Sequence, residues 1–216
     1  MNKIALRLGG VFLAGVVIFS FTGCGSYNRL VTLENNVNKK WADVQSVYQR
    51  RADLIPNLVS TVQGAANFEK STLTEVTNAR ASVGQVKLDP NKAPTDAAQL
   101  EQFQAARGQL SNALSRLLVV SENYPQLRAT EAFQTLQAQL EGTENRISVE
   151  RNNFNTAVQE YNTYMQRFPT NMLNKMFGFK ARPFFAAQPG SEKAPAVKFD
   201  FGSSPAAPAP APVATP

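Results

Sequence analysis

The sequence predicts an all-α protein, built as four long helices in an antiparallel up-and-down bundle. Apolar residues recur at three- and four-residue steps in several stretches between residues 27 and 168, which is the spacing of an amphipathic helix. Segments rich in helix breakers, such as residues 89–94, separate these stretches. Because one such helix alone is marginally stable in water, the helices are expected to share their apolar stripes in a bundle.

Residues 1–24 are predicted to be a signal peptide or membrane anchor. Lys3 and Arg7 precede an uncharged stretch, residues 8–28, with an apolar run at its centre. The stretch contains Gly23-Cys24, a small residue before a cysteine as in the lipobox of bacterial lipoproteins, so Cys24 is the candidate lipidation site. A lipid on Cys24 and an uncleaved anchor helix both stay open. If the basic residues remain inside, either would place the bundle outside the cytoplasm.

The first two bundle helices are expected to meet at a corner near residues 51–53. Asp53 is a good N-cap, and Pro56 follows within one turn, whereas proline in mid-helix would cost about 3 kcal/mol. The second helix should stop before the breakers of residues 89–94. The expected stripes are Leu30, Leu33, Val37, Trp41, Val44 and Tyr48, then Leu58, Val62, Ala65, Leu73, Val76 and Val83.

The third helix is expected to begin at Thr95 or Asp96 and to end at Tyr124, because the residue before a proline is disfavoured in the α conformation. Thr130 should cap the fourth helix, and Phe168-Pro169 should close it. Their stripes include Leu100, Phe103, Ala106, Leu110, Leu114, Leu117 and Val120, then Phe133, Leu136, Leu140, Ile147, Phe154, Val158, Tyr161, Met165 and Phe168.

Three domains follow from this pattern: the anchor of residues 1–24, the bundle of residues 27–187, and a tail of residues 188–216. The tail consists mostly of Pro, Ala, Gly and Ser and is predicted to be disordered, because it cannot bury enough apolar surface. Before it, residues 172–185 mix large apolar and basic side chains. That mixture suits a membrane surface or, preferably, a lid over the end of the bundle.

Composition excludes most common catalytic and metal sites. The chain has no histidine and one cysteine, so Ser-His-Asp triads, Cys-His dyads, Cys/His zinc sites and an internal disulfide are excluded. No metal, cofactor or small-molecule substrate is predicted. The net charge of +6 lies towards the ends, since residues 27–168 carry 15 Lys and Arg against 14 Asp and Glu. Nucleic-acid binding is therefore not expected.

Several motifs in order resemble those of the LemA family. They cover residues 27 to about 185 and comprise YNRLV at 27–31, Val37, Trp41, RRADLIPNLVSTVQG at 50–64, NAR at 78–80, ENYP at 122–125, TENRI at 143–147, RNNFN at 151–155, YN at 161–162 and FP at 168–169. The resemblance implies a bacterial envelope protein with one N-terminal membrane segment and a bundle of long helices. It implies no established activity.

The predicted function is a non-catalytic interaction or scaffolding module, anchored in the membrane on the periplasmic side of the cell envelope and bound to protein partners there. The alternative is a carboxylate-dependent envelope enzyme, for which Glu144 is the best candidate acid. The spacing of Glu141, Glu144 and Arg151 instead favours a bond from Glu144 to an Asn or Arg across the helix seam.

Arg50, Arg51 and Asn57 form the candidate partner-binding site. Adjacent helical positions point to different faces, so the two arginines are not expected to serve one purpose. One should have an acidic partner within the bundle, with Glu122 or Glu69 as candidates. The other should be exposed beside Asn57 and available to a protein partner.

Overall fold

The computed structural model describes residues 2–64, 68–86 and 88–186. The side chains of residues 2–24 and 173–175 lie outside this description, and so does the predicted tail, residues 188–216. The fold described below is that of the unit Met1–Phe185.

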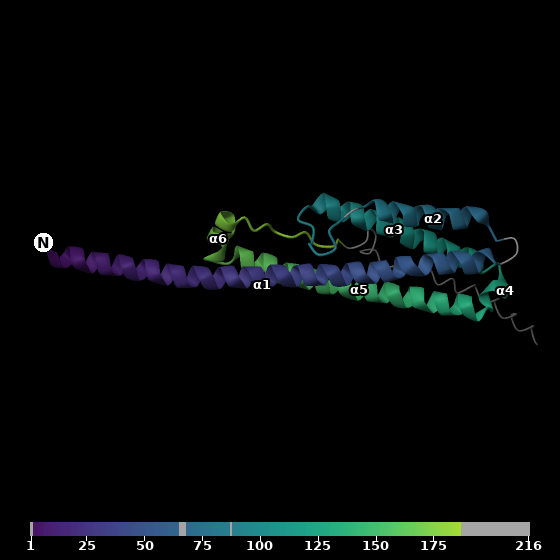
Figure 1. Ribbon diagram of the computed structural model, residues 1–216, viewed down its shortest axis with the longest axis horizontal. Coiled ribbons are helices and arrows are strands. Elements are labelled where there is room, and N and C mark those ends of the chain that lie inside the picture. The colour runs from purple at the N-terminus through teal and green to yellow at the C-terminus, as the bar shows by residue number, and fades with distance from the viewer. Residues whose placement is uncertain (1, 65–67, 87, 187–216) are drawn as a thin grey trace, which may run out of the picture. The chain divides into compact units, whose positions relative to one another are not determined.

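The predicted all-α fold is confirmed, with helices and no strand in the described residues. In Figure 1, α1 lies along α5, and α2 lies along α3. The contacts between α1 and α5 show that these two helices are antiparallel. Trp41 of α1 meets Phe154 of α5, whereas Arg51, later in α1, meets Glu144, which lies earlier in α5. The helices are α1 (Asn2–Gln63), α2 (Lys70–Gln85), α3 (Ala97–Ser121), α4 (Pro125–Arg128), α5 (Glu131–Gln166) and α6 (Thr170–Phe177).

The predicted corner near residues 51–53 is wrong, because α1 continues through Pro56 to Gln63. Pro56 lacks the N–H that would bond the carbonyl of residue 52. The buried stripe nevertheless crosses the proline without a change of spacing, through Tyr48, Arg51, Ile55, Leu58 and Val62. Burying this stripe outweighs the local cost of the proline, and the helix ends at Gln63 instead.

The expected caps of the later helices are confirmed. The side chain of Asp96 accepts a hydrogen bond from the backbone N–H of Ala98 at 2.9 Å, and Thr130 accepts one from Phe133 at 3.4 Å. Each cap satisfies a backbone donor that the first turn of a helix leaves free.

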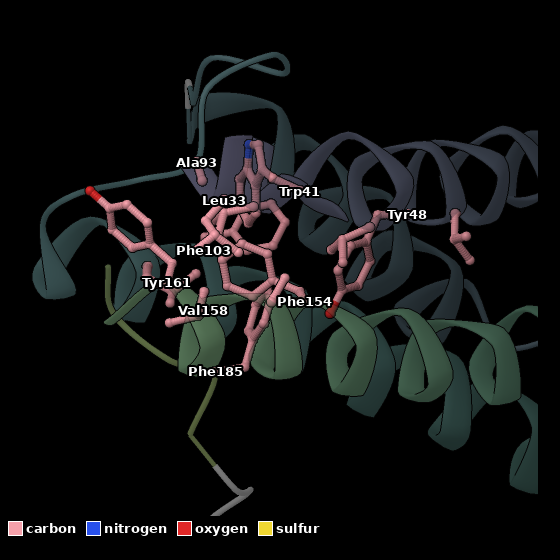
Figure 2. Close-up of a cluster of buried hydrophobic side chains, with 14 of the residues drawn as sticks. Leu33, Trp41, Tyr48, Ala93, Phe103, Phe154, Val158, Tyr161 and Phe185 are labelled. Atoms are coloured by element: carbon pink, nitrogen blue, oxygen red, sulfur yellow. The ribbon is translucent and has the colours of Figure 1, made fainter. Parts of the chain in front are cut away.

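Two hydrophobic clusters make up the core. The aromatic cluster surrounds Trp41, whose ring centroid lies 5.4 Å from Phe103, 5.7 Å from Phe154 and 6.1 Å from Phe185 (Figure 2). The aliphatic cluster lies further along α1 and fills the space between the helices with mainly Leu, Val and Ala. Its buried members are Ile55, Leu58, Val62, Phe68, Leu73, Val76, Ala79, Val83, Ala106, Leu110, Ala113, Leu114, Leu117, Leu127, Phe133, Leu136 and Leu140.

Candidate functional site

A polar layer lies between the two clusters and is formed by Arg51, Ser111 and Glu144. Arg51 takes a position on the buried stripe of α1 and is only 8% exposed. Its Nη1 donates to Ser111 Oγ of α3 at 2.9 Å and to the carboxylate of Glu144 on α5. One arginine therefore joins three helices, and a polar group at a single seam position of this kind fixes the register of the helices.

The expectation that one of the two arginines has an acidic partner is confirmed for Arg51. The partner is Glu144 rather than Glu122 or Glu69, and the predicted bond from Glu144 across the seam is confirmed with it. Glu122 and Glu69 are both exposed. The proposed partners were wrong because α1 does not turn at residue 51, so Arg51 faces the middle of α5.

A second arginine flanks the polar layer. The guanidinium of Arg107 lies 4.7 Å from the ring centroid of Tyr48 and 5.0 Å from that of Phe103, within the range of cation–π attraction. Burial lowers the pKa of Arg107 to about 10. Burial also raises the pKa of Tyr48, against the opposing effect of Arg151 and Arg107. At neutral pH the arginine is still charged and the tyrosine neutral.

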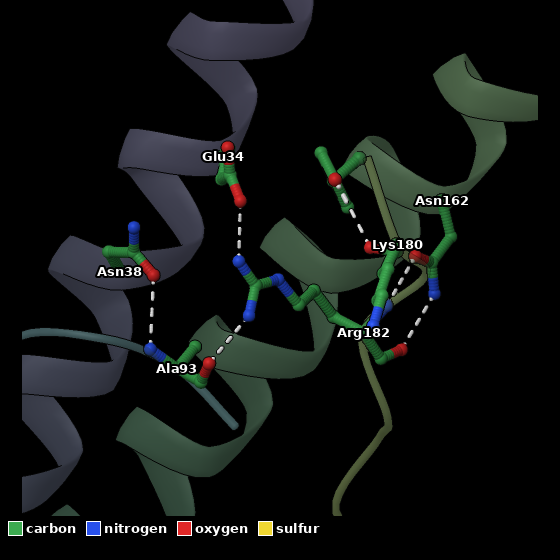
Figure 3. Close-up of polar contacts among 7 residues, drawn as sticks. Glu34, Asn38, Ala93, Asn162, Lys180 and Arg182 are labelled. Carbon is green, nitrogen blue, oxygen red and sulfur yellow. Dashed lines mark hydrogen bonds and ion pairs between the residues drawn. The ribbon is translucent and has the colours of Figure 1, made fainter. Parts of the chain in front are cut away.

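At the aromatic end, Arg182 closes the bundle. It belongs to an extended segment, residues 178–185, that we call the strap. Arg182 is 3% exposed and donates to the carbonyl of Ala93 at 2.6 Å and to the carboxylate of Glu34 (Figure 3). Asn162 of α5 bonds the backbone N–H and carbonyl of Arg182, each at 2.9 Å. The ion pair thus ties α1, the loop before α3 and the strap together.

A cleft of about 430 Å³ lies over this contact. Its lining includes Glu34 and Arg182, which are bonded to each other, together with Asp89, Lys92 and Lys180. Beside it, Tyr161 donates its hydroxyl hydrogen to the carbonyl of Lys180 at 3.1 Å. Burial, followed by the charge of Glu34, raises the pKa of Tyr161 to about 12. The Tyr161 hydroxyl therefore stays protonated at neutral pH, and the carboxylate of Glu34 is held by Arg182.

Arg50 and Asn57 are exposed, on the face of α1 that points away from the buried stripe. Asp53 lies between them and is exposed too, and it accepts a hydrogen bond from Gln49 at 2.7 Å. Its predicted role as an N-cap is wrong, since no helix begins there. Arg50 makes no ion pair with any residue that the structure describes. The face therefore offers free polar groups, while its use by a partner stays a prediction.

Cys24 lies within α1, but its side chain, like those of the rest of the predicted anchor at residues 1–24, lies outside the description. Among the residues whose side chains the structure describes, no helix is long and apolar enough to cross a membrane.

The described residues include no group of three or more His, Cys, Asp or Glu side chains that could hold a metal ion. The carboxylates of Glu34 and Glu144 are each bonded to an arginine. What the two polar contacts can do is therefore to hold helices in register and close the end of the bundle. Sequence reasoning missed the role of Arg182. The sequence signal that could have indicated a segment bound to the helix was the pair Asn155 and Asn162. Each of these asparagines directly follows a residue of the apolar stripe.

Known proteins similar to this chain include magnetosome proteins. Residues 40–199 match the model of the LemA family. The chain is 26% identical over 201 residues to magnetosome protein MamQ 2 of Paramagnetospirillum magneticum, with 84% of this chain and 72% of that protein covered. It is 26% identical over 197 residues to magnetosome protein MamQ of Magnetospirillum gryphiswaldense, with the same shares covered.

A similar protein is also found outside the magnetosome group. The chain is 24% identical over 161 residues to Protein LemA of Metamycoplasma hominis, with 74% of this chain and 68% of that protein covered. The matched range contains Arg51, Glu144 and Arg182 of the two polar contacts, whereas Glu34 lies outside it.

Proposed function

The chain belongs to the LemA family, and from that premise we propose that it is a non-catalytic, membrane-anchored module of the bacterial cell envelope that scaffolds protein partners. The bundle would stand on the extracytoplasmic, periplasmic side, held by the N-terminal segment or by a lipid on Cys24. Family membership alone does not supply this role, so the proposal rests on how the chain uses its charged residues.

The observation that carries the proposal is that the ion pairs of both buried arginines hold segments of the bundle together. Arg51 is bonded to Glu144, and Arg182 is bonded to Glu34. A carboxylate-dependent enzyme would need an acid or base free to reach a substrate. Glu144 is instead bound by an arginine from the facing helix, so the geometry favours a rigid scaffold over a catalyst.

The proposed partner surface is the exposed face of α1 around Arg50 and Asn57. This face belongs to the same helix as Arg51, which the polar layer fixes in register against α5. A rigid helix presents its exposed side chains at fixed spacing, which lowers the entropic cost of ordering them on binding.

In-cell photo-crosslinking of the full-length chain, read by mass spectrometry, tests this surface. Arg50→Glu should abolish specific crosslinks to other envelope proteins, because it reverses the charge of the exposed arginine on this face. The melting temperature should change little, as for most exposed substitutions. Arg80→Glu, at an exposed arginine of α2, is the matched control and should leave the crosslinks intact. Crosslinks that survive both changes would contradict the proposed surface.

The mode of anchoring has its own test. We expect Cys24→Ser to abolish labelling by radioactive palmitate and to leave a larger, unprocessed chain. If labelling, size and membrane fraction are all unchanged, the lipid attachment is wrong and the uncleaved anchor helix holds the protein.

A further inference from the structure

A group of large apolar side chains is exposed on and just before α6. Phe168 is 79% exposed, Met172 61%, Met176 69% and Phe177 49%. We call these four residues the apolar foot. Scattered exposed apolar residues are normal, but a group within ten positions of one short segment marks an interaction site. Val119 and Val149 are exposed as well, each on a different long helix.

Residues 172–185 were expected to form either a lid over the end of the bundle or a membrane surface, and the strap and the foot differ in this respect. Phe185 of the strap is 4% exposed and packs on Trp41 and Phe154, so the strap covers the end of the bundle as a lid would. Met172 and Met176, in contrast, point away from that core, as their exposure shows. The lid function therefore ends at the strap and leaves Met172 and Met176 exposed.

The position of the foot along α1 is fixed by Tyr27. The ring of Tyr27 lies 5.0 Å from that of Phe177 and 5.8 Å from that of Phe179. Figure 1 shows α6 beside α1 at the point beyond which α1 extends alone towards the N-terminus. Because α1 is one continuous helix, the height of Tyr27 above a membrane follows from the anchor.

Both forms of the proposed anchor place Tyr27 at the lipid–water interface. The uncharged stretch of residues 8–28 ends one residue after Tyr27, so a spanning helix would put this tyrosine at the boundary where Tyr is enriched. A lipid on Cys24 would leave Tyr27 about 4.5 Å further along the helix, at 1.5 Å per residue. Phe177 of the foot, in contact with Tyr27, then lies at the same height.

The charge around the foot also fits a membrane surface. No acidic residue occurs between Glu160 and Glu192, whereas Arg167, Lys175 and Lys180 lie in this interval. Residues 1–33 likewise contain basic residues and no acidic one. Anionic lipid attracts basic residues near its surface by about 1 kcal/mol each.

We propose that the apolar foot inserts into the headgroup region of an anionic lipid bilayer and holds the bundle at a fixed angle to the membrane. The proposal rests on the proposed membrane anchoring, since α6 is too short to bind lipid firmly by itself. Tethering by the anchor raises the effective concentration of the foot at the membrane. Amphipathic helices in this situation bury their apolar face about 5 to 10 Å into the boundary of headgroups and acyl chains.

Fluorescence quenching by brominated lipid tests the insertion with the full-length chain in vesicles of phosphatidylcholine and phosphatidylglycerol. The native Trp41 is fully buried and supplies the background. Met176→Trp adds a reporter at the foot and should lose about half or more of its added emission to bromine on the acyl chains. Phe177→Trp is a second reporter, in case one variant folds poorly. Val119→Trp, at an exposed site on α3, is the matched control and should not be quenched.

The outcomes separate this inference from the anchoring. If the protein floats with the vesicles but neither foot reporter is quenched more than Val119→Trp, the inference is overturned while the anchoring stands. Unquenched but blue-shifted foot emission would mean that protein covers the foot, and would overturn it as well. If the chain fails to float, the anchoring fails and this inference with it. Equal quenching in vesicles of phosphatidylcholine alone would refute the role of anionic lipid.

Discussion

The two ends of the bundle are held together in different ways. In the aliphatic cluster, helices meet along apolar stripes, and the surface above carries the pair Arg116–Glu75, whose side chains are 66% and 43% exposed. In the aromatic cluster, irregular chain joins the core: Phe185 of the strap and Ala93 of the loop before α3 are both buried. Polar side chains from the helices bond the backbone of both segments.

This difference shows which side chains a helix needs in order to bind a segment that is not helical. Two helices satisfy their own backbone groups, so apolar side chains at regular spacing are enough to join them. An extended segment has free N–H and C=O groups that must find partners when buried. Asn38, Asn155 and Asn162 supply those partners with their amides, and Arg182 and Trp41 add donors.

The largest difference between the two ends should come from large-to-small substitutions. Trp41→Ala should cost about 4 kcal/mol or more, and Leu117→Ala about 3 kcal/mol. Trp41 contacts three aromatic rings and also donates its indole hydrogen to the carbonyl of Asp89 at 2.9 Å, whereas Leu117 loses packing only. Chemical denaturation of both variants measures this. Equal losses would contradict the view that Trp41 also secures the loop.

The polar layer should respond unequally to loss of its two members. Glu144→Ala should cost about 3 kcal/mol, because it leaves the buried Arg51 without its acid. Arg51→Met should change stability by less than about 1 kcal/mol, because the side chain of Glu144 is 44% exposed and can be hydrated. Unfolding in urea gives both values. A larger loss for Arg51→Met than for Glu144→Ala would show that the layer is held chiefly by the packing of the arginine.

The ion pairs Arg182–Glu34 and Arg116–Glu75, at opposite ends of the bundle, should differ as well. Arg182→Lys should cost about 1 to 2 kcal/mol, since lysine cannot bond Ala93 and Glu34 from one planar group. Arg116→Lys should leave the melting temperature almost unchanged, because both this arginine and its partner Glu75 are exposed at the surface. Thermal melts of the two variants side by side provide the measurement. Similar shifts would mean that burial does not distinguish these pairs.

A smaller effect should appear at alkaline pH through Tyr161. The folded state raises the pKa of this phenol from 10 to about 12, so the unfolded chain loses the proton first as pH rises. Folding stability should therefore fall between pH 10 and 12. Tyr161→Phe should lose less stability over the same interval, although it starts lower by about 1 kcal/mol for the lost hydrogen bond. Parallel stability curves for the two proteins would contradict the assignment.

Regular features of the bundle were predictable from sequence, while its irregular contacts were not. Asp96 and Thr130 precede the third and fourth apolar stripes, so local capping chemistry located both helix starts. Pro56 led to a wrong prediction of the end of the first helix. The free-energy cost of the proline is local, whereas the apolar burial that outweighs it depends on the other helices. The bond between Asn162 and Arg182 joins positions 20 residues apart, and no periodicity indicates where an extended segment will fold back.

Hydrogen exchange of the full-length chain tests most directly the claim that polar side chains of the helices hold the strap and loop. In the double variant Asn155→Ala and Asn162→Ala, backbone amides of residues 179–185 should exchange much faster, and those of residues 88–94 should follow through Arg182. Amides of α2 and of α3 around Leu117 should be unchanged. Asn153→Ala is the matched control, because its side chain bonds only within α5, to Glu150. Faster exchange spread evenly over the bundle, or none in the strap, would contradict the account.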